Sequence, residues 1–166
     1  KQTIIDEQGE VIDEMSGSII IHKPNKFKWH YKKPYEQIFI RNENRFISYD
    51  IDLNSYFIRD IDTLKSNALR VLLNDNQKIS LELEYLDVYE KNGILWTHLL
   101  YYGKSNDSFE FTLGFQGNTL SKMLLKDSLG QDMVIDFKDL ILNPDINSTL
   151  FDIDNLIEYL SNNFSS

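Results

Sequence analysis

Hydrophobic and polar residues alternate with a period of two along most of the chain, and short polar breaks separate the alternating segments. The segments with this pattern are 10–22, 26–31, 35–41, 45–53, 55–61, 78–90, 94–102, 108–115, 119–127 and 132–142. Period-two alternation predicts half-buried β-strands. Because the breaks between neighbouring segments have the length of hairpin turns, consecutive strands are expected to be antiparallel neighbours.

Two segments have helical spacing instead. The first, 62–75, begins behind Asp62, which is a suitable N-cap; its apolar residues are Leu64, Ala68, Leu69 and Leu72. The second is the tail 152–164, where Ile157, Leu160 and Phe164 share one side and carboxylates occupy the first turn. Negative charge is favourable there because of the helix dipole.

A series of antiparallel strands broken by one short helix is typical of an incomplete antiparallel β-barrel or a highly curved sheet. The chain is therefore expected to be mainly β, with a short lid helix and a C-terminal helix. Its 166 residues fit one domain of ordinary size. No linker, repeat or low-complexity tract marks a boundary, so 1–166 is expected to be a single domain.

The largest apolar side chains at alternate positions define the face expected to point inward. Its main members are Phe27, Trp29, Tyr31, Ile47, Tyr49, Leu81, Leu83, Phe109, Phe111 and Leu113. A barrel of this size either fills its interior with such side chains or holds one apolar guest. Aromatic stripes are normally core, so the residue types leave both interpretations open.

The segment 26–34 combines aromatic rings with cations, which raises the question of nucleic-acid binding. Along an extended strand Phe27, Trp29 and Tyr31 point one way, while Lys26, Lys28 and His30 point the other. Readers of single-stranded nucleic acid need rings and cations on the same solvent-facing side. The formal charge of −9 also repels nucleic acid and anionic membrane surfaces. Neither is an expected partner.

Catalytic and metal-binding patterns are absent from the sequence. There is no cysteine, and His22, His30 and His98 have no metal-ligand spacing with one another. No nucleophile elbow, phosphate loop or dinucleotide fingerprint occurs. We therefore expect no enzyme activity, no cofactor and no metal. No apolar run reaches the roughly 18 residues that a membrane-spanning helix needs, so the chain is not expected to be embedded in a membrane.

The segment 22–61 resembles the outer-membrane lipoprotein carrier family, LolA. The matching residues are Lys23, Pro24, Phe27, Trp29, Pro34, Gln37, Tyr49 and Asp50. Further similarity follows in order: 68–73 for a short helix, 120–144 for a late hairpin, and Phe151 at the start of the last strand. The resemblance covers about residues 2–153.

The resemblance implies an incomplete barrel, lidded by helices, whose hydrophobic cavity takes the acyl chains of lipoproteins. Such periplasmic carriers receive lipoproteins from an inner-membrane ABC transporter and deliver them to an outer-membrane receptor; a monomer is expected. The helix 62–75 would be the lid, with Lys23 able to bond to it. Two alternatives remain: the outer-membrane receptor of the same fold, and a non-enzymatic lipid-binding or adaptor barrel.

Three departures from the family pattern stand out. The N-terminal helix of the family and a signal peptide do not precede Gln2, so a truncated form is expected. Lys23 stands where the family usually has Arg, and this change removes a planar donor fork. The tail 152–164 replaces a proline-rich stretch, so different packing is expected at the C-terminal end.

Overall fold

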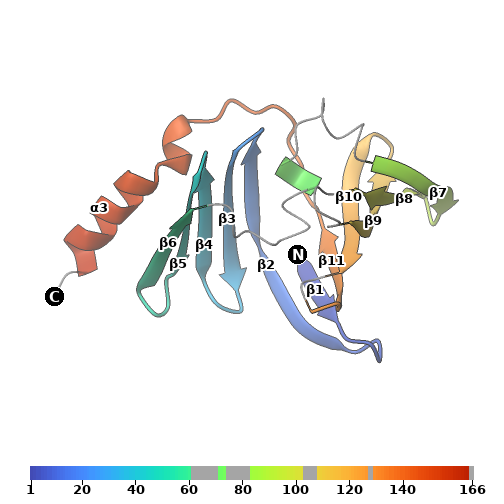
Figure 1. Cartoon of the computed structure of the whole chain (residues 1–166), viewed down its shortest axis with the longest axis horizontal. Helices are drawn as coiled ribbons and strands as arrows, with labels where there is room; N and C mark the ends of the chain where they lie inside the picture. The colour runs from blue at the N-terminus through green and yellow to red at the C-terminus, as the bar shows by residue number, and fades with distance from the viewer. Residues whose placement is uncertain (61–70, 74–82, 103–107, 127–128, 165–166) are drawn as a thin grey trace. The chain divides into compact units, whose positions relative to one another are not determined.

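The computed structural model describes residues 1–60, 71–73, 83–102, 108–126 and 129–164. These residues are mainly β (Figure 1). The strands are β1 (Gln2–Ile5), β2 (Val11–His22), β3 (Lys26–Lys33), β4 (Gln37–Asn42), β5 (Arg45–Asp50), β6 (Ser55–Asp60), β7 (Leu83–Lys91), β8 (Ile94–Tyr101), β9 (Phe109–Gln116), β10 (Thr119–Lys126) and β11 (Asp132–Asp136). A 3-10 helix, η2 (Ser148–Phe151), and the α-helix α3 (Ile153–Phe164) follow.

The strands are hydrogen-bonded in the order β6-β5-β4-β3-β2-β1-β11-β10-β9-β8-β7. Strands β6 and β7 stand at the two ends of this order, so the described sheet is not closed into a barrel. The expected fold class, a mainly β chain built on an antiparallel sheet that stops short of closure, is confirmed.

The chain divides into two compact units. Unit 1 contains Lys1–Glu14 and Lys65–Leu142, and unit 2 contains Met15–Leu64 and Asn143–Ser166. Strand β2 begins in unit 1 and continues in unit 2. That the whole chain is one folding domain remains a prediction.

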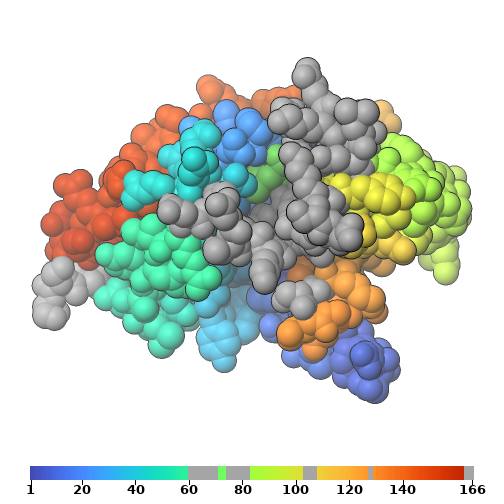
Figure 2. Space-filling model, viewed as in Figure 1, coloured from blue at the N-terminus to red at the C-terminus, as the bar shows by residue number. Residues whose placement is uncertain are grey.

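In unit 2, consecutive hairpins build the sheet, and its C-terminal segment covers one face of that sheet. Ile40 and Ile47 pair across β4 and β5 and form a buried cluster with Phe151 and Ile153. The amphipathic helix α3 packs its apolar side against this cluster, and Figure 2 shows its red surface against the strands. One face of the unit 2 sheet is therefore closed by η2 and α3.

In unit 1, antiparallel pairing separates an apolar face from a polar one. The apolar face buries Leu99 opposite Phe111 and Phe111 opposite Leu125. The other face bears an ion pair between Lys122 and Asp136 and a 3.0 Å contact between the His98 ring and the Glu110 carboxylate. Unit 1 thus has the alternation typical of a half-buried antiparallel sheet.

Several expected boundaries need correction. Strand β1 lies outside the segments with period-two alternation, and only the family resemblance suggested a strand that starts near Gln2. The segment expected as a strand over 132–142 ends at Asp136. Phe151 does not begin a strand: it ends η2, and a helix follows it. The C-terminal helix is confirmed, with Asp152 accepting a hydrogen bond from the Asn155 N–H at 3.0 Å, as capping requires.

The expected lid helix lies mostly outside the described residues. Only 71–73 of it are described, and they are helical. Across the described chain, no helix has both the length and the apolar character required to cross a membrane.

Candidate functional site

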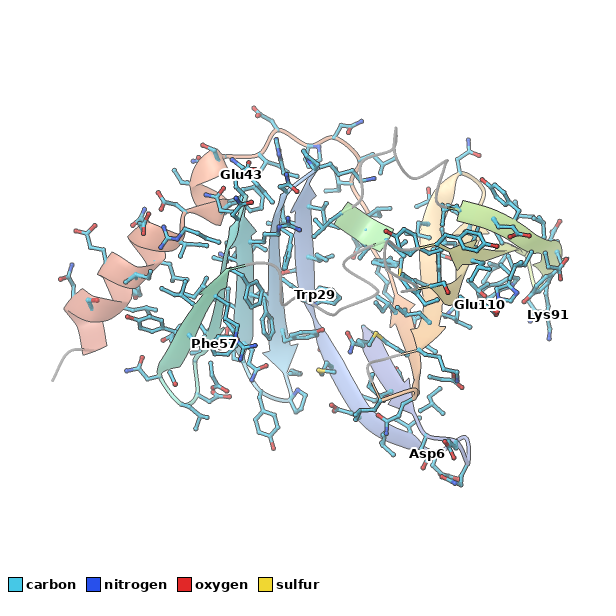
Figure 3. All side chains as sticks on the ribbon, viewed as in Figure 1. Asp6, Trp29, Glu43, Phe57, Lys91 and Glu110 are labelled. Atoms are coloured by element: carbon cyan, nitrogen blue, oxygen red, sulfur yellow. The ribbon has the colours of Figure 1, made fainter. Side chains whose placement is uncertain are left out.

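The hairpins of unit 2 collect aromatic side chains on one face of the sheet. Trp29 of β3 pairs with Phe39 of β4, and Phe39 pairs with Ser48 of β5. Directly paired residues of antiparallel strands point to the same face. Trp29, labelled in Figure 3, points to the side of this sheet away from α3.

The rings on this face form a continuous series of contacts. We define the aromatic face as Phe27, Trp29, Tyr31, Phe39, Phe46 and Phe57. Ring centroids lie 5.3 Å apart for Trp29 and Tyr31, 5.9 Å for Tyr31 and Phe39, and 6.1 Å for Phe39 and Phe46. Phe46 extends the series to Phe27 at 6.4 Å and to Phe57 at 6.5 Å. These separations are within the range of favourable aromatic pairs.

Burial changes across the aromatic face. Phe27 is fully buried and Phe46 is nearly so, whereas Trp29 and Phe39 are half-buried. Phe57, on the terminal strand β6, is 45% exposed. The face therefore has a buried part at β3 and β5 and an open border at β6.

Ile47 and Tyr49 do not share this face, contrary to the expectation from the sequence. Ile47 pairs with Ile40, which pairs with Lys28 on the other side of β3. Ile47 instead belongs to the cluster with Phe151. The physical reason is the two-residue turn between β4 and β5, which pairs odd-numbered with even-numbered positions, so Phe46 rather than Ile47 joins the aromatic face.

The cations that were expected opposite the aromatic rings do lie on the opposite face of the sheet. They are only partly exposed to solvent there. Lys28 pairs with Ile40, and the His30 Nε2 lies 2.7 Å from the Glu36 carboxylate. Both side chains are half-buried.

In unit 1, the structure brings together most of the residues expected there. Phe109, Phe111 and Leu113 alternate along β9 on the apolar face. Leu83 pairs with Tyr101, and Tyr101 pairs with Phe109, at a ring separation of 5.1 Å. Leu81 lies outside the described residues.

The expected lid residues are only partly described. Leu64, Ala68 and Leu69 lie outside the described residues, and Leu72 is half-buried in the helical residues 71–73. Lys23 is exposed in the turn between β2 and β3. Bonding of Lys23 to a lid remains a prediction.

Sequence reasoning missed three members of the aromatic face, Phe39, Phe46 and Phe57. The available signal was the length of the turns. Starting from Phe27 and Trp29 and counting through each hairpin gives Phe39, then Phe46, then Phe57. A periodicity judged strand by strand does not contain this information, because it does not relate one strand to the next.

Charged groups lie at the two ends of the aromatic face. Arg41 pairs with Phe27 and with Phe46, and Phe46 pairs with Arg59. At the other end, the Gln37 side chain donates a 3.0 Å hydrogen bond to Asp50. Burial lowers the pKa of the Arg41 guanidinium below its usual value, although the Glu43 charge raises it in part. Within the described residues, no group of three or more acidic, histidine or cysteine side chains could hold a metal ion.

These features define a β-sheet protein with an extended apolar face. The chain belongs to the family described as outer membrane lipoprotein carrier protein LolA, whose model matches residues 1–154.

Individual relatives agree with this assignment. The outer-membrane lipoprotein carrier protein of Methylobacillus flagellatus is 30% identical over 151 residues, which cover 91% of this chain and 74% of the relative. That of Xylella fastidiosa is 32% identical over 148 residues, covering 86% of this chain and 69% of the relative.

Proposed function

We propose that this protein is a periplasmic carrier that binds the acyl chains of lipoproteins against its apolar sheet faces. In this proposal it receives lipoproteins from an inner-membrane ABC transporter and hands them, as a monomer, to an outer-membrane receptor. The family membership and the names of the relatives support the carrier role. No catalytic step is involved.

The physical problem that such a carrier solves is the transfer of lipid through water. Moving an acyl chain out of a membrane costs about 0.8 kcal/mol for each methylene exposed. A protein surface that replaces the membrane must therefore offer continuous apolar contact. The single observation that supports the proposal best is the continuous aromatic face with its open border at Phe57.

A displacement assay tests acyl binding directly. The purified chain is loaded with the neutral fluorescent probe N-phenyl-1-naphthylamine, and a triacylated cysteine lipopeptide with an uncharged peptide is added. The wild-type protein should release the probe. Phe57→Glu should weaken lipopeptide binding about tenfold, because a charged carboxylate in contact with acyl chains loses hydration without gaining a partner.

The next residue along β6 provides a matched control. Ile58 is on the same terminal strand, and its side chain is 43% exposed, against 45% for Phe57. Unlike Phe57, it lies on the opposite face of the sheet. Ile58→Glu should leave lipopeptide binding unchanged. Equal effects of the two substitutions, or no displacement by the lipopeptide from wild type, would contradict the proposed function.

The handover is tested separately with inner-membrane vesicles that contain the transporter and a labelled lipoprotein. On addition of ATP, the wild-type chain should release lipoprotein into solution, and Phe57→Glu should release less. If the vesicles released the same amount of lipoprotein with and without the added chain, the carrier role would be contradicted. The evidence for acyl binding would not be affected.

A further inference from the structure

Two arginines border the aromatic face at the end where β4 turns into β5. Cross-strand pairing places Phe27, Arg41, Phe46 and Arg59 in one row across β3, β4, β5 and β6. Arg41 and Arg59 are therefore separated by a single strand, which puts their backbones about 10 Å apart. Two arginine side chains reach a common point over that distance.

Neither guanidinium forms an ion pair with a carboxylate in the described part of the chain. Arg41 donates from Nε to the Glu43 backbone carbonyl at 3.0 Å and from a terminal nitrogen to the Asn25 side chain at 3.2 Å. Arg59 lies over the Phe57 ring, 4.5 Å from its centroid. Both cations keep donors for a further acceptor, since each guanidinium has five N–H groups.

Among the described residues, two carboxylates belong to this face: that of Glu43 lies near the arginine end, where its charge acts on Arg41, and that of Asp50 lies at the far end. The Glu43 carboxylate is 3.8 Å from the Lys26 ammonium. Asp50 lies in the row that pairs Gln37 with Asp50, at the opposite end of the same face. The aromatic face is thus positive at one end and negative at the other, in a protein whose net charge is −9.

We infer that, in addition to lipoprotein acyl chains, the aromatic face binds acyl lipids with an anionic phosphate head group, which Arg41 and Arg59 hold while the rings contact the acyl chains. The inference rests on the proposed acyl binding and adds a head-group preference to it. Charge complementarity orients the ligand: the phosphate lies at the arginine end, and the acyl chains extend over Trp29 and Phe39 away from Arg41.

The chemistry of the two side chains suits phosphate. The planar fork of a guanidinium forms paired hydrogen bonds with phosphate oxygens. Arg41 is half-buried, so a counter-anion beside it acts in a partly desolvated setting where charge pairing is stronger than in bulk water. A neutral acyl lipid would leave both cations without that partner.

The test compares two lipids that differ only in the phosphate. Dioctanoyl phosphatidic acid and dioctanoylglycerol are titrated, below their micelle concentrations, into protein loaded with N-phenyl-1-naphthylamine. Hydrogen bonds that involve charged groups are strong enough to give the phosphatidic acid about a tenfold preference. Inorganic phosphate alone should not displace the probe, which distinguishes a lipid head group from free phosphate.

Three arginine variants make the test specific. Arg59→Gln should remove most of the preference, and Arg41→Gln should do the same. Arg45→Gln is the matched control: it removes the same charge from the same end of the sheet, but Arg45 lies on the other face, 2.8 Å from the Asp154 carboxylate of α3. The preference should survive in Arg45→Gln.

The head-group inference would be overturned if the two lipids displaced the probe equally from wild type. It would also be overturned if Arg45→Gln and Arg59→Gln lost the preference for phosphatidic acid equally. In both cases, displacement by the lipopeptide would still support acyl binding. Failure of both lipids and of the lipopeptide to displace the probe would overturn the inference and the proposed function together. If Arg59→Gln does not fold, Arg59→Lys replaces it. A smaller preference for phosphatidic acid than in wild type then supports the inference. An unchanged preference in both Arg59→Lys and Arg41→Gln overturns it.

Discussion

At the scale of single residues, Phe46 and Ile47 illustrate how neighbouring side chains take different roles. Both are buried, but Phe46 joins the aromatic face and Ile47 packs against Phe151 on the other side. Strand β5 is buried on both sides, on one side within the cluster that contains Phe151 and on the other among the rings of the aromatic face. Substitutions at these two positions therefore report on different properties of the protein.

Gly17 is required by a close backbone approach. A Cβ atom at this position would lie 1.9 Å from the His30 carbonyl oxygen. Gly17→Ala should force β2 and β3 apart and lower the free energy of unfolding by about 1–3 kcal/mol. Urea denaturation followed by circular dichroism measures this loss. The adjacent exposed residue gives the control, since Ser18→Ala should change stability by less than about 0.5 kcal/mol. Equal stability of both variants would contradict the clash.

Asp50 links stability to pH. Hydrogen bonds from the Gln37 side chain and from the Leu53 and Asp52 backbone lower the pKa of its carboxyl below the usual value. A lowered folded-state pKa means that its stabilising effect is present above the unfolded-state pKa, near 3.8. That effect is lost as the pH falls through the folded-state pKa.

Asp50→Asn should therefore lower the melting temperature at pH 7 and have a smaller effect near pH 2. Differential scanning calorimetry at both pH values measures the two shifts. A shift of the same size at both pH values would show that the ionised carboxylate is not responsible.

At the scale of elements, η2 and α3 fix one face of the unit 2 sheet. Family similarity ends at residue 154, so most of α3 lies beyond the matched region. The helix nevertheless packs against Ile40 and Ile47, which belong to strands within the family match. The ion pair between Arg45 and Asp154 ties the first turn of α3 to β5.

Phe151 should be the main anchor of this segment. Its side chain is 1% exposed, and truncation leaves a cavity beside Ile47. Phe151→Ala should cost about 3–5 kcal/mol in the free energy of unfolding. Leu53→Ala, at a position that is 76% exposed in the same unit, is the control and should be nearly neutral. A small loss in Phe151→Ala would mean that α3 is held by other contacts.

At the scale of the whole molecule, the two units are interleaved along the chain. Unit 2 is made from two segments, with most of unit 1 between them in the sequence, and β2 passes from one unit into the other. Neither unit can be cut out as one continuous segment.

We therefore expect the chain to unfold in one cooperative transition. Calorimetry tests this by comparing the calorimetric enthalpy with the van't Hoff enthalpy, which agree for a two-state protein. Two resolved transitions, with Phe151→Ala shifting only one of them, would show that the units unfold independently and that the single-domain expectation is wrong.

The sequence by itself indicated most of the strands, the C-terminal helix and the family. Period-two alternation in β3 and β9 is contained directly in the order of residues, because a strand sends successive side chains to opposite faces. The aromatic alternation of Phe27, Trp29 and Tyr31 was readable for the same reason. The C-terminal helix was readable from the spacing of Ile157 and Leu160.

Only the tertiary structure decided which strand faces come together. Ile47 and Tyr49 looked suitable for the aromatic face, but the register of the β4–β5 hairpin turned them to α3 and brought Phe46 and Phe57 to the rings. The same register placed Arg41 and Arg59 in one row. Pairing between strands depends on turn geometry and on burial across the sheet, and neither is contained in the periodicity of a single segment.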